Sequence, residues 1–211
     1  MTQSKKPVEN ALVTGFAPFG PHNINPSWEV AKLLSGTTMT TDKQSVLISS
    51  LLLPVEYQPV VDIVSPLHRE PHQYKYIFHI GVGLDGPVEM ETLARNGPYQ
   101  KVDNRNEIPD GNYTKGPDTL YTKVDVEKVL EWGKKEKKWD AEDVRVCADA
   151  GLYLCEWTFY LSLRESQEKD TKHATVLFIH VPTMGDGKGQ KSLQKMTELV
   201  REIIEGVISH T

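Results

Sequence analysis

The sequence is poor in cysteine, with only Cys147 and Cys155 among 211 residues. Two cysteines are too few for a disulfide framework or a cysteine-based zinc cluster, and the scattered histidines lack ligand spacing. We expect Cys147 inside a strand and Cys155 near the start of the next helix, where the two thiols should not pair. Free thiols fit a reducing, cytoplasmic compartment. We therefore expect no metal, no cofactor and no disulfide.

Long apolar runs and an excess of positive charge are also missing. No stretch approaches the roughly 20 apolar residues that a membrane-spanning helix needs, and the polar segment 1–10 leads into a strand without an apolar signal segment. The formal net charge of −5 gives no general attraction to nucleic acid or to an anionic membrane. We expect a soluble protein that binds neither nucleic acid nor membrane.

Short apolar runs alternate with amphipathic ones along the chain, without internal repeats. The apolar runs predict strands at 11–16, 45–55, 74–83, 144–151 and 174–182. The amphipathic runs predict helices at 25–34, 57–70, 124–138, 153–165 and 192–208. Continuously apolar strands alternating with helices indicate a largely parallel sheet covered on both faces. We expect an α/β protein, a three-layer α/β/α sandwich with a mostly parallel central sheet (phosphorylase/hydrolase-like), forming a single domain over 1–211.

The segment 85–120 differs from the rest of the chain. It is polar, rich in glycine, proline and asparagine, and shows no helical or strand period. So long an irregular stretch inside a compact domain is typically functional or mobile. We expect an irregular segment, and its role and the conformation of 97–118 are left open.

In parallel α/β folds the site lies outside the carboxyl ends of the strands. The loops there would bring together Cys155, His180 and the carboxylates of Asp85, Glu89 and Glu91. A cysteine, a histidine and an acid suit thiol catalysis, and a helix N-terminus favours a thiolate and offers N–H groups to an oxyanion. From composition alone, an inert core cysteine and a histidine bonded to backbone remain the alternatives.

Four stretches together resemble the pyroglutamyl-peptidase type I family. These are "TGFAPFG" followed by "NPSW", "ETLARN" after the "HIGVG" strand, "AGLYLC" and "FIHVP". They occur in the family's order and spread over nearly the whole chain. Members of that family are intracellular cysteine peptidases that remove an N-terminal pyroglutamate from peptides.

The resemblance implies roles for three residues of a catalytic triad. Cys155 would be the nucleophile, His180 the general base and Glu91 the acid that orients the histidine. Glu89 is the alternative acid, because residues two apart on an extended segment share a face.

The resemblance also implies a substrate pocket. Phe16 and Phe19 would clamp the lactam ring, Asn25 would brace the site, Ile108 would form an apolar wall, and Arg105 would stand where the family has an arginine near the active site. Tyr153 and Leu154, beside the cysteine, can face the same pocket. Two aromatic faces suit a flat, neutral lactam, whereas an uncyclised N-terminal glutamine would bring in a charged ammonium at a desolvation cost.

The sequence thus predicts a cysteine exopeptidase (an omega peptidase) whose substrates are peptides with N-terminal pyroglutamate. Three other functions remain open: an inactive binding protein on the same scaffold, a phosphate- or nucleoside-binding enzyme, and a sheet-edge interaction module. The phosphate-binding alternative would use the glycines of "GFAPFG", which match neither G-x-G-x-x-G nor a Walker pattern. The oligomeric state is left open.

Overall fold

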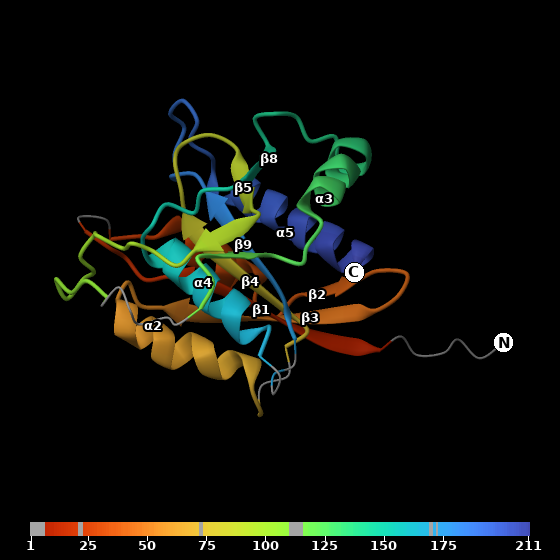
Figure 1. Ribbon diagram of the computed structural model, residues 1–211. Coiled ribbons are helices and arrows are strands. Elements are labelled where there is room, and N and C mark those ends of the chain that lie inside the picture. The colour runs from red at the N-terminus through yellow and green to blue at the C-terminus, as the bar shows by residue number, and fades with distance from the viewer. Residues whose placement is uncertain (1–6, 21–22, 72–73, 110–115, 169–170, 172) are drawn as a thin grey trace.

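A central sheet of seven strands organises the protein, as seen in a computed structural model that describes residues 7–20, 23–71, 74–109, 116–168, 171 and 173–211 (Figure 1). Across the sheet the strands lie in the order β2-β3-β1-β4-β9-β5-β8. Their bounds are Val8–Phe16 (β1), Thr38–Thr40 (β2), Ser45–Leu53 (β3), Tyr76–Val82 (β4), Val88–Glu91 (β5), Val144–Cys147 (β8) and Thr175–Val181 (β9).

The centre of the sheet is parallel, as predicted. Strands β3, β1, β4 and β9 run in the same direction, and β5 and β8 are parallel to each other. The two antiparallel pairings join β2 to β3 and β5 to β9. Almost every side chain of β4 and β9 is buried, because helices cover both faces.

Five α-helices in the described part of the chain form the outer layers. One face carries α1 (Pro26–Leu34), α3 (Val126–Trp132) and α5 (Leu193–His210), whose apolar side chains share one core cluster with the sheet. The opposite face carries α2 (Tyr57–Val64) and α4 (Leu154–Glu165), which pack together over the second cluster (Figure 1). The three-layer α/β/α prediction is confirmed. None of the helices in the described ranges is long and apolar enough to cross a membrane.

The expectation that 85–120 lacks regular structure was wrong. This segment contains β5 and a two-stranded ribbon of β6 (Leu93–Arg95) and β7 (Thr119–Tyr121), which packs on α4. Strand β5 reads "VEME", and all four residues are buried, including both glutamates. A short strand with two glutamates does not show the apolar pattern of a buried strand. The glutamates can be buried only because charged partners elsewhere in the chain bind them.

Several element boundaries also differ from the predictions. Strand β8 ends at Cys147 rather than at 151, which leaves a loop before α4. Helix α2 ends at Val64 and continues as a 3₁₀ turn over Ser65–His68, where Pro66 cannot continue an α-helical hydrogen-bond pattern.

Candidate active site

Cys155 is the second residue of α4, and its position depends on a sharp turn before the helix. Gly151 and Leu152 both adopt the left-handed conformation, with φ of 91° and 47°. Tyr153 then serves as the N-cap residue without a side-chain cap hydrogen bond, so the first N–H groups of α4 are not used by its side chain. The thiol lies over β4, where a Cβ on Gly81 would come within 2.7 Å of the Cys155 Sγ.

His180 lies beside Gly81 in the sheet and joins the cysteine to an acid. The two residues are register partners on β9 and β4. His180 interacts with the Cys155 side chain on one side, and its Nδ1 lies 2.8 Å from Oε1 of Glu91 on the other. His180 is 5% exposed and Glu91 is fully buried, so these two groups are shielded from water, whereas Cys155 is partly exposed.

The side chains around His180 favour the charged form of its ring. Burial alone would lower the pKa of His180, but interactions with the side chains of Cys155 and Glu91 outweigh burial and raise that pKa to about 10. At neutral pH the ring beside Cys155 is therefore an imidazolium. In this charge state a histidine can donate a proton to a leaving group.

An apolar pocket opens beside the thiol. Its lining residues come from the ends of β1, β3 and β4 and from the start of α4: Phe16, Phe19, Asn25, Val55, Val82, Tyr153, Leu154 and Cys155. Asn25 donates a hydrogen bond to the Ala17 carbonyl (3.0 Å) and accepts one from the Ser27 N–H (3.1 Å), which ties the Phe16–Phe19 loop to the start of α1. Such a pocket suits a small, flat, neutral group.

A family model described as pyroglutamyl peptidase matches residues 9–208. The chain belongs to the pyroglutamyl peptidase family. Pyroglutamyl-peptidase 1 of Homo sapiens is 31% identical over 97% of this chain and 92% of that protein. Pyrrolidone-carboxylate peptidase of Saccharolobus islandicus is 29% identical over 81% of this chain and 78% of that protein. The crystal structure of Bacillus amyloliquefaciens pyroglutamyl peptidase I is similar with a TM-score of 0.80, at 25% identity over 96% of this chain and 98% of that chain.

Within this member of the pyroglutamyl peptidase family, Glu89 and Glu91 have different partners. Glu89 is the register partner of His180 across the β5–β9 pair, yet its carboxylate binds Arg145, whose Nε lies 2.8 Å from Oε1. Glu91 binds His180 and also accepts the Asp149 N–H at 3.2 Å. The geometry therefore aims Glu91, not Glu89, at the imidazole.

Two of the residues assigned to the pocket lie elsewhere. Arg105 forms an ion pair with Glu56, and Ile108 is 51% exposed; neither lines the pocket beside Cys155. The hydrogen bonds from Arg105 N–H and Glu107 N–H to Asp103 fold this loop back on itself, which turns both side chains outward. The other five residues predicted to bind substrate line the pocket.

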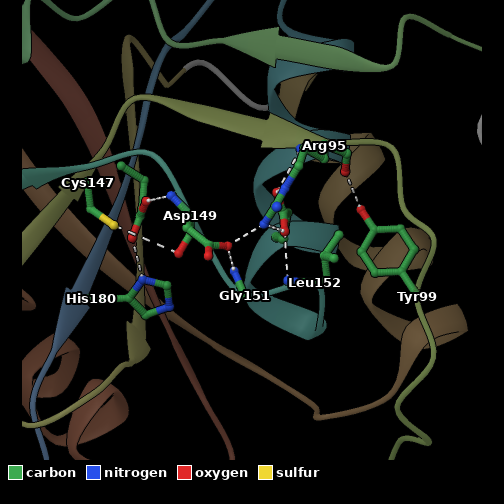
Figure 2. A network of polar contacts seen from close by, with 9 residues as sticks. Arg95, Tyr99, Cys147, Asp149, Gly151, Leu152 and His180 are labelled. Carbon is green, nitrogen blue, oxygen red and sulfur yellow. Dashed lines mark hydrogen bonds and ion pairs between the residues drawn. The ribbon is translucent and has the colours of Figure 1, made fainter.

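Sequence reasoning missed Val55 and Val82 in the pocket, and it missed Arg95 and Glu156, which are linked to Glu91 through Asp149. The two valines lie at or just beyond strand ends, where the rule for parallel sheets would have found them. Arg95 and Glu156 form a network with Tyr99, Asp149, Gly151 and Leu152 close to His180 (Figure 2). A glutamate inside the apolar run "LCEWTFYLSL" was the available signal of a buried acid with a partner.

One group of described side chains, Glu89, Glu91 and His180, has the spacing of metal ligands. Their existing partners already balance the charges, because Arg145 binds Glu89 and the raised pKa of His180 keeps its ring protonated. An imidazolium has no lone pair to offer a metal ion. The group therefore fits an acid–base site better than a metal site.

Cys147 differs from Cys155 although both thiols are free. Burial and the charge of Glu91 raise the pKa of Cys147 to about 11. Its S–H lies 3.8 Å from the Asp149 carbonyl (Figure 2). Cys147 therefore remains a protonated thiol at neutral pH.

Proposed function

We propose that this protein hydrolyses the bond after an N-terminal pyroglutamyl residue through a thioacyl-enzyme intermediate, with Cys155, His180 and Glu91 in the catalytic roles. The observation that carries the proposal is the arrangement of Cys155 over Gly81, of His180 beside Gly81 in the sheet, and of Glu91 bonded to His180, next to an apolar pocket. The sequence similarity to pyroglutamyl-peptidase 1 of Homo sapiens supports the choice of substrate.

In the first step the Cys155 thiolate attacks the pyroglutamyl carbonyl carbon, and the carbonyl oxygen becomes an oxyanion. The N–H groups at the start of α4, which the Tyr153 side chain does not cap, would donate to this oxygen. The C–N bond then breaks, and the His180 imidazolium gives its proton to the departing amine. The products of this step are a thioester on Cys155, a shortened peptide and a neutral imidazole.

In the second step the neutral imidazole takes a proton from water, and the hydroxide attacks the thioester carbonyl. The second tetrahedral intermediate collapses by breaking the C–S bond, which releases pyroglutamic acid and restores the thiolate beside the imidazolium. Glu91 accepts a hydrogen bond from His180 Nδ1 throughout and stabilises the positive charge of the ring.

The pocket accounts for selection of the cyclised residue. Phe16, Phe19 and Leu154 offer apolar surfaces, and the described lining residues include no carboxylate that would bind an ammonium group. A free N-terminal amine would lose its hydration there without gaining a partner. An uncyclised glutamine is therefore a poor substrate.

The decisive experiment is release of a fluorophore from a pyroglutamyl amide under reducing conditions. Wild type should turn over, Cys155→Ser should be inactive, and Cys147→Ser should keep full activity because Cys147 remains a thiol at neutral pH. The matched glutaminyl amide should not be cleaved. An inert wild type, or an active Cys155→Ser variant, would contradict the proposal.

We also propose that the protein acts as a single domain in a reducing, cytoplasmic compartment. The free thiols of Cys147 and Cys155 support this, since oxidation of the nucleophile would stop turnover. Cell fractionation followed by the same fluorogenic assay, with and without reductant, tests the location.

A further inference from the structure

The carboxylate of Glu156, the residue after the proposed nucleophile, is fully buried and accepts four hydrogen bonds. Its Oε1 accepts the backbone N–H and the Nε–H of Arg95, at 2.8 and 2.7 Å. Its Oε2 accepts an N–H from Arg95 Nη2 at 3.0 Å and the backbone N–H of Leu152 at 2.7 Å. A buried charge with this many donors is fixed in place.

The bond to Leu152 acts on the most strained part of the turn before α4. Leu152 has φ of 47°, which is uncommon for a residue with a Cβ and costs free energy, and Gly151 precedes it with φ of 91°. Such a conformation persists only where neighbouring contacts hold it. The Glu156 carboxylate supplies one such contact from within the first turn of the same helix.

Arg95 holds the other side of the turn. Its guanidinium also forms an ion pair with Asp149, whose Oδ1 accepts the Gly151 N–H at 3.2 Å. The backbone N–H of Asp149 in turn donates to Oε2 of Glu91. The turn is therefore tied to Glu91 at one end and to Glu156 at the other (Figure 2).

Arg95 is itself held rigidly against α4. The Tyr99 hydroxyl donates to the Arg95 carbonyl at 2.7 Å (Figure 2), and the Tyr99 ring packs edge-on against Trp157 with centroids 5.0 Å apart. The hydrogen bond to Glu156 raises the pKa of Arg95 above its usual value, so the guanidinium keeps its charge at every working pH.

We propose that Arg95 and Glu156 are positioning residues for the hydrolytic reaction, a role that rests on the proposed function. Neither residue lines the substrate pocket. They act through the Gly151–Leu152 turn, which sets where the first N–H groups of α4 and the Cys155 thiol stand relative to the substrate carbonyl. Loss of the pair lets the turn relax and displaces the oxyanion donors.

The test compares Arg95→Met and Glu156→Gln with wild type in three measurements. The first is kcat and KM on a pyroglutamyl amide, the second is the rate of Cys155 alkylation by iodoacetamide, and the third is inhibition by pyroglutamyl aldehyde. We expect kcat to fall on the order of 10²-fold with KM little changed, because a misplacement of about 1 Å costs that much.

The alkylation and aldehyde measurements separate positioning from a general structural loss. Alkylation reports the thiolate and should stay close to the wild-type rate. The aldehyde forms a tetrahedral adduct with Cys155 whose oxygen uses the same N–H groups as the oxyanion, so its affinity should fall in parallel with kcat.

Arg69→Met is the matched control. Arg69 binds Glu165, another buried carboxylate, at 2.6 Å on the opposite end of α4. This variant removes the same kind of ion pair from the same helix and should lower the melting temperature while leaving kcat unchanged. If Arg69→Met lowers kcat as much as Arg95→Met does, the positioning proposal is overturned.

Arg95→Lys keeps the test decisive if Arg95→Met does not fold. Lysine keeps the positive charge, but its single ammonium group cannot replace both the Nε and the Nη2 of Arg95 on the Glu156 carboxylate. The kcat of Arg95→Lys should therefore be intermediate between those of wild type and Glu156→Gln. Wild-type kcat in folded Glu156→Gln or Arg95→Lys, or an alkylation rate that falls in proportion to kcat, would overturn the proposal. An inert wild type would instead reject the proposed function.

Discussion

The thiol of Cys155 lies directly over the Cα of Gly81, at a distance that only a residue without a Cβ allows. A Cβ at position 81 would lie 2.7 Å from the Cys155 Sγ and 2.8 Å from the Phe178 ring. The helix that carries the nucleophile therefore approaches the sheet at the point where β4 and β9 present Gly81 and His180 side by side. This close approach brings the thiol within hydrogen-bonding reach of the imidazole.

Gly81→Ala should move the thiol and disable the site. We expect kcat/KM to fall on the order of 10²-fold through misplacement of the nucleophile, and the free energy of unfolding to fall by about 1–3 kcal/mol through overpacking. Gly206→Ala is the control, because its new Cβ would crowd the Trp132 ring at 2.9 Å, away from the site. Full activity in Gly81→Ala would show that the contact is not needed.

Glu91→Gln should reduce turnover by about 10²–10⁴-fold while the fold is kept, because the imidazolium loses its anionic partner. Glu89→Gln should change kcat/KM by less than about tenfold, since it removes an ion pair with the half-exposed side chain of Arg145. Both variants are compared on the same pyroglutamyl amide, with circular dichroism to check folding. Equal losses in the two variants would refute the assignment of Glu91 as the orienting acid.

The protonation of His180 should depend on its two anionic neighbours. With a pKa of about 10, above the ordinary 6.5, the ring is charged at neutral pH and loses its proton as the pH rises toward 10. The charged pair thus contributes stability that is fully present below pH 6.5 and is lost as the pH rises through about 10. The Cys155→Ala variant lacks one of the two side chains that raise the pKa of His180, while the ring stays buried. An NMR titration of this variant should therefore give a lower pKa for His180. An unchanged titration would contradict the thiolate–imidazolium pair.

Two buried histidines should make the fold sensitive to acid. Burial and the neighbouring charge of Arg69 lower the pKa of His68 to about 4. Burial and the neighbouring His68 lower the pKa of His79 to about 3. Below pH 6.5 the unfolded chain binds protons that the folded protein does not, so the free energy of unfolding decreases as the pH falls toward 4. The loss should be about 1 kcal/mol per pH unit for each histidine.

Urea unfolding of wild type and of the double variant His68→Gln/His79→Gln, each at pH 7.5 and pH 5, measures this effect. The double variant should lose less stability than wild type over this interval. Within the described part of the chain, each ring has one nitrogen without a hydrogen-bond partner, His68 Nδ1 and His79 Nε2, so protonation at that nitrogen would place an unpaired charge in the core. The same loss in both proteins would assign the acid sensitivity to other groups.

The parallel core of the sheet could be predicted from the sequence because its strands are continuously apolar. Strands β4 and β9 read "YIFHIGV" and "TVLFIHV", and nearly all their side chains are buried. The position of Cys155 at the start of a helix and of His180 on a strand followed from the same pattern. Their roles as a catalytic pair remain a proposal.

Strand β5 and the identity of Arg95 as the partner of Glu156 could not be predicted from local patterns. Each depends on charged partners that lie far away in the chain: Glu89 on Arg145, Glu91 on His180, and Glu156 on Arg95, 61 positions before it. A short strand that contains glutamates resembles a solvent-exposed segment as long as the residues that bind the carboxylates are not known. Ile108 and Arg105 were misplaced for a related reason, since the turn around Asp103 decides which way their loop faces.

The pleat of β5 places a second carboxylate, that of Glu89, on the same face of the strand as Glu91. Glu89 and Glu91 point to the same face, and the antiparallel ladder with β9 fixes which of them meets the imidazole. A slip of β5 by one residue would send both carboxylates to the opposite face, whereas a slip by two would bring Glu89 to the place that Glu91 now holds. The register of β5 against β9 therefore decides which of the two carboxylates meets His180.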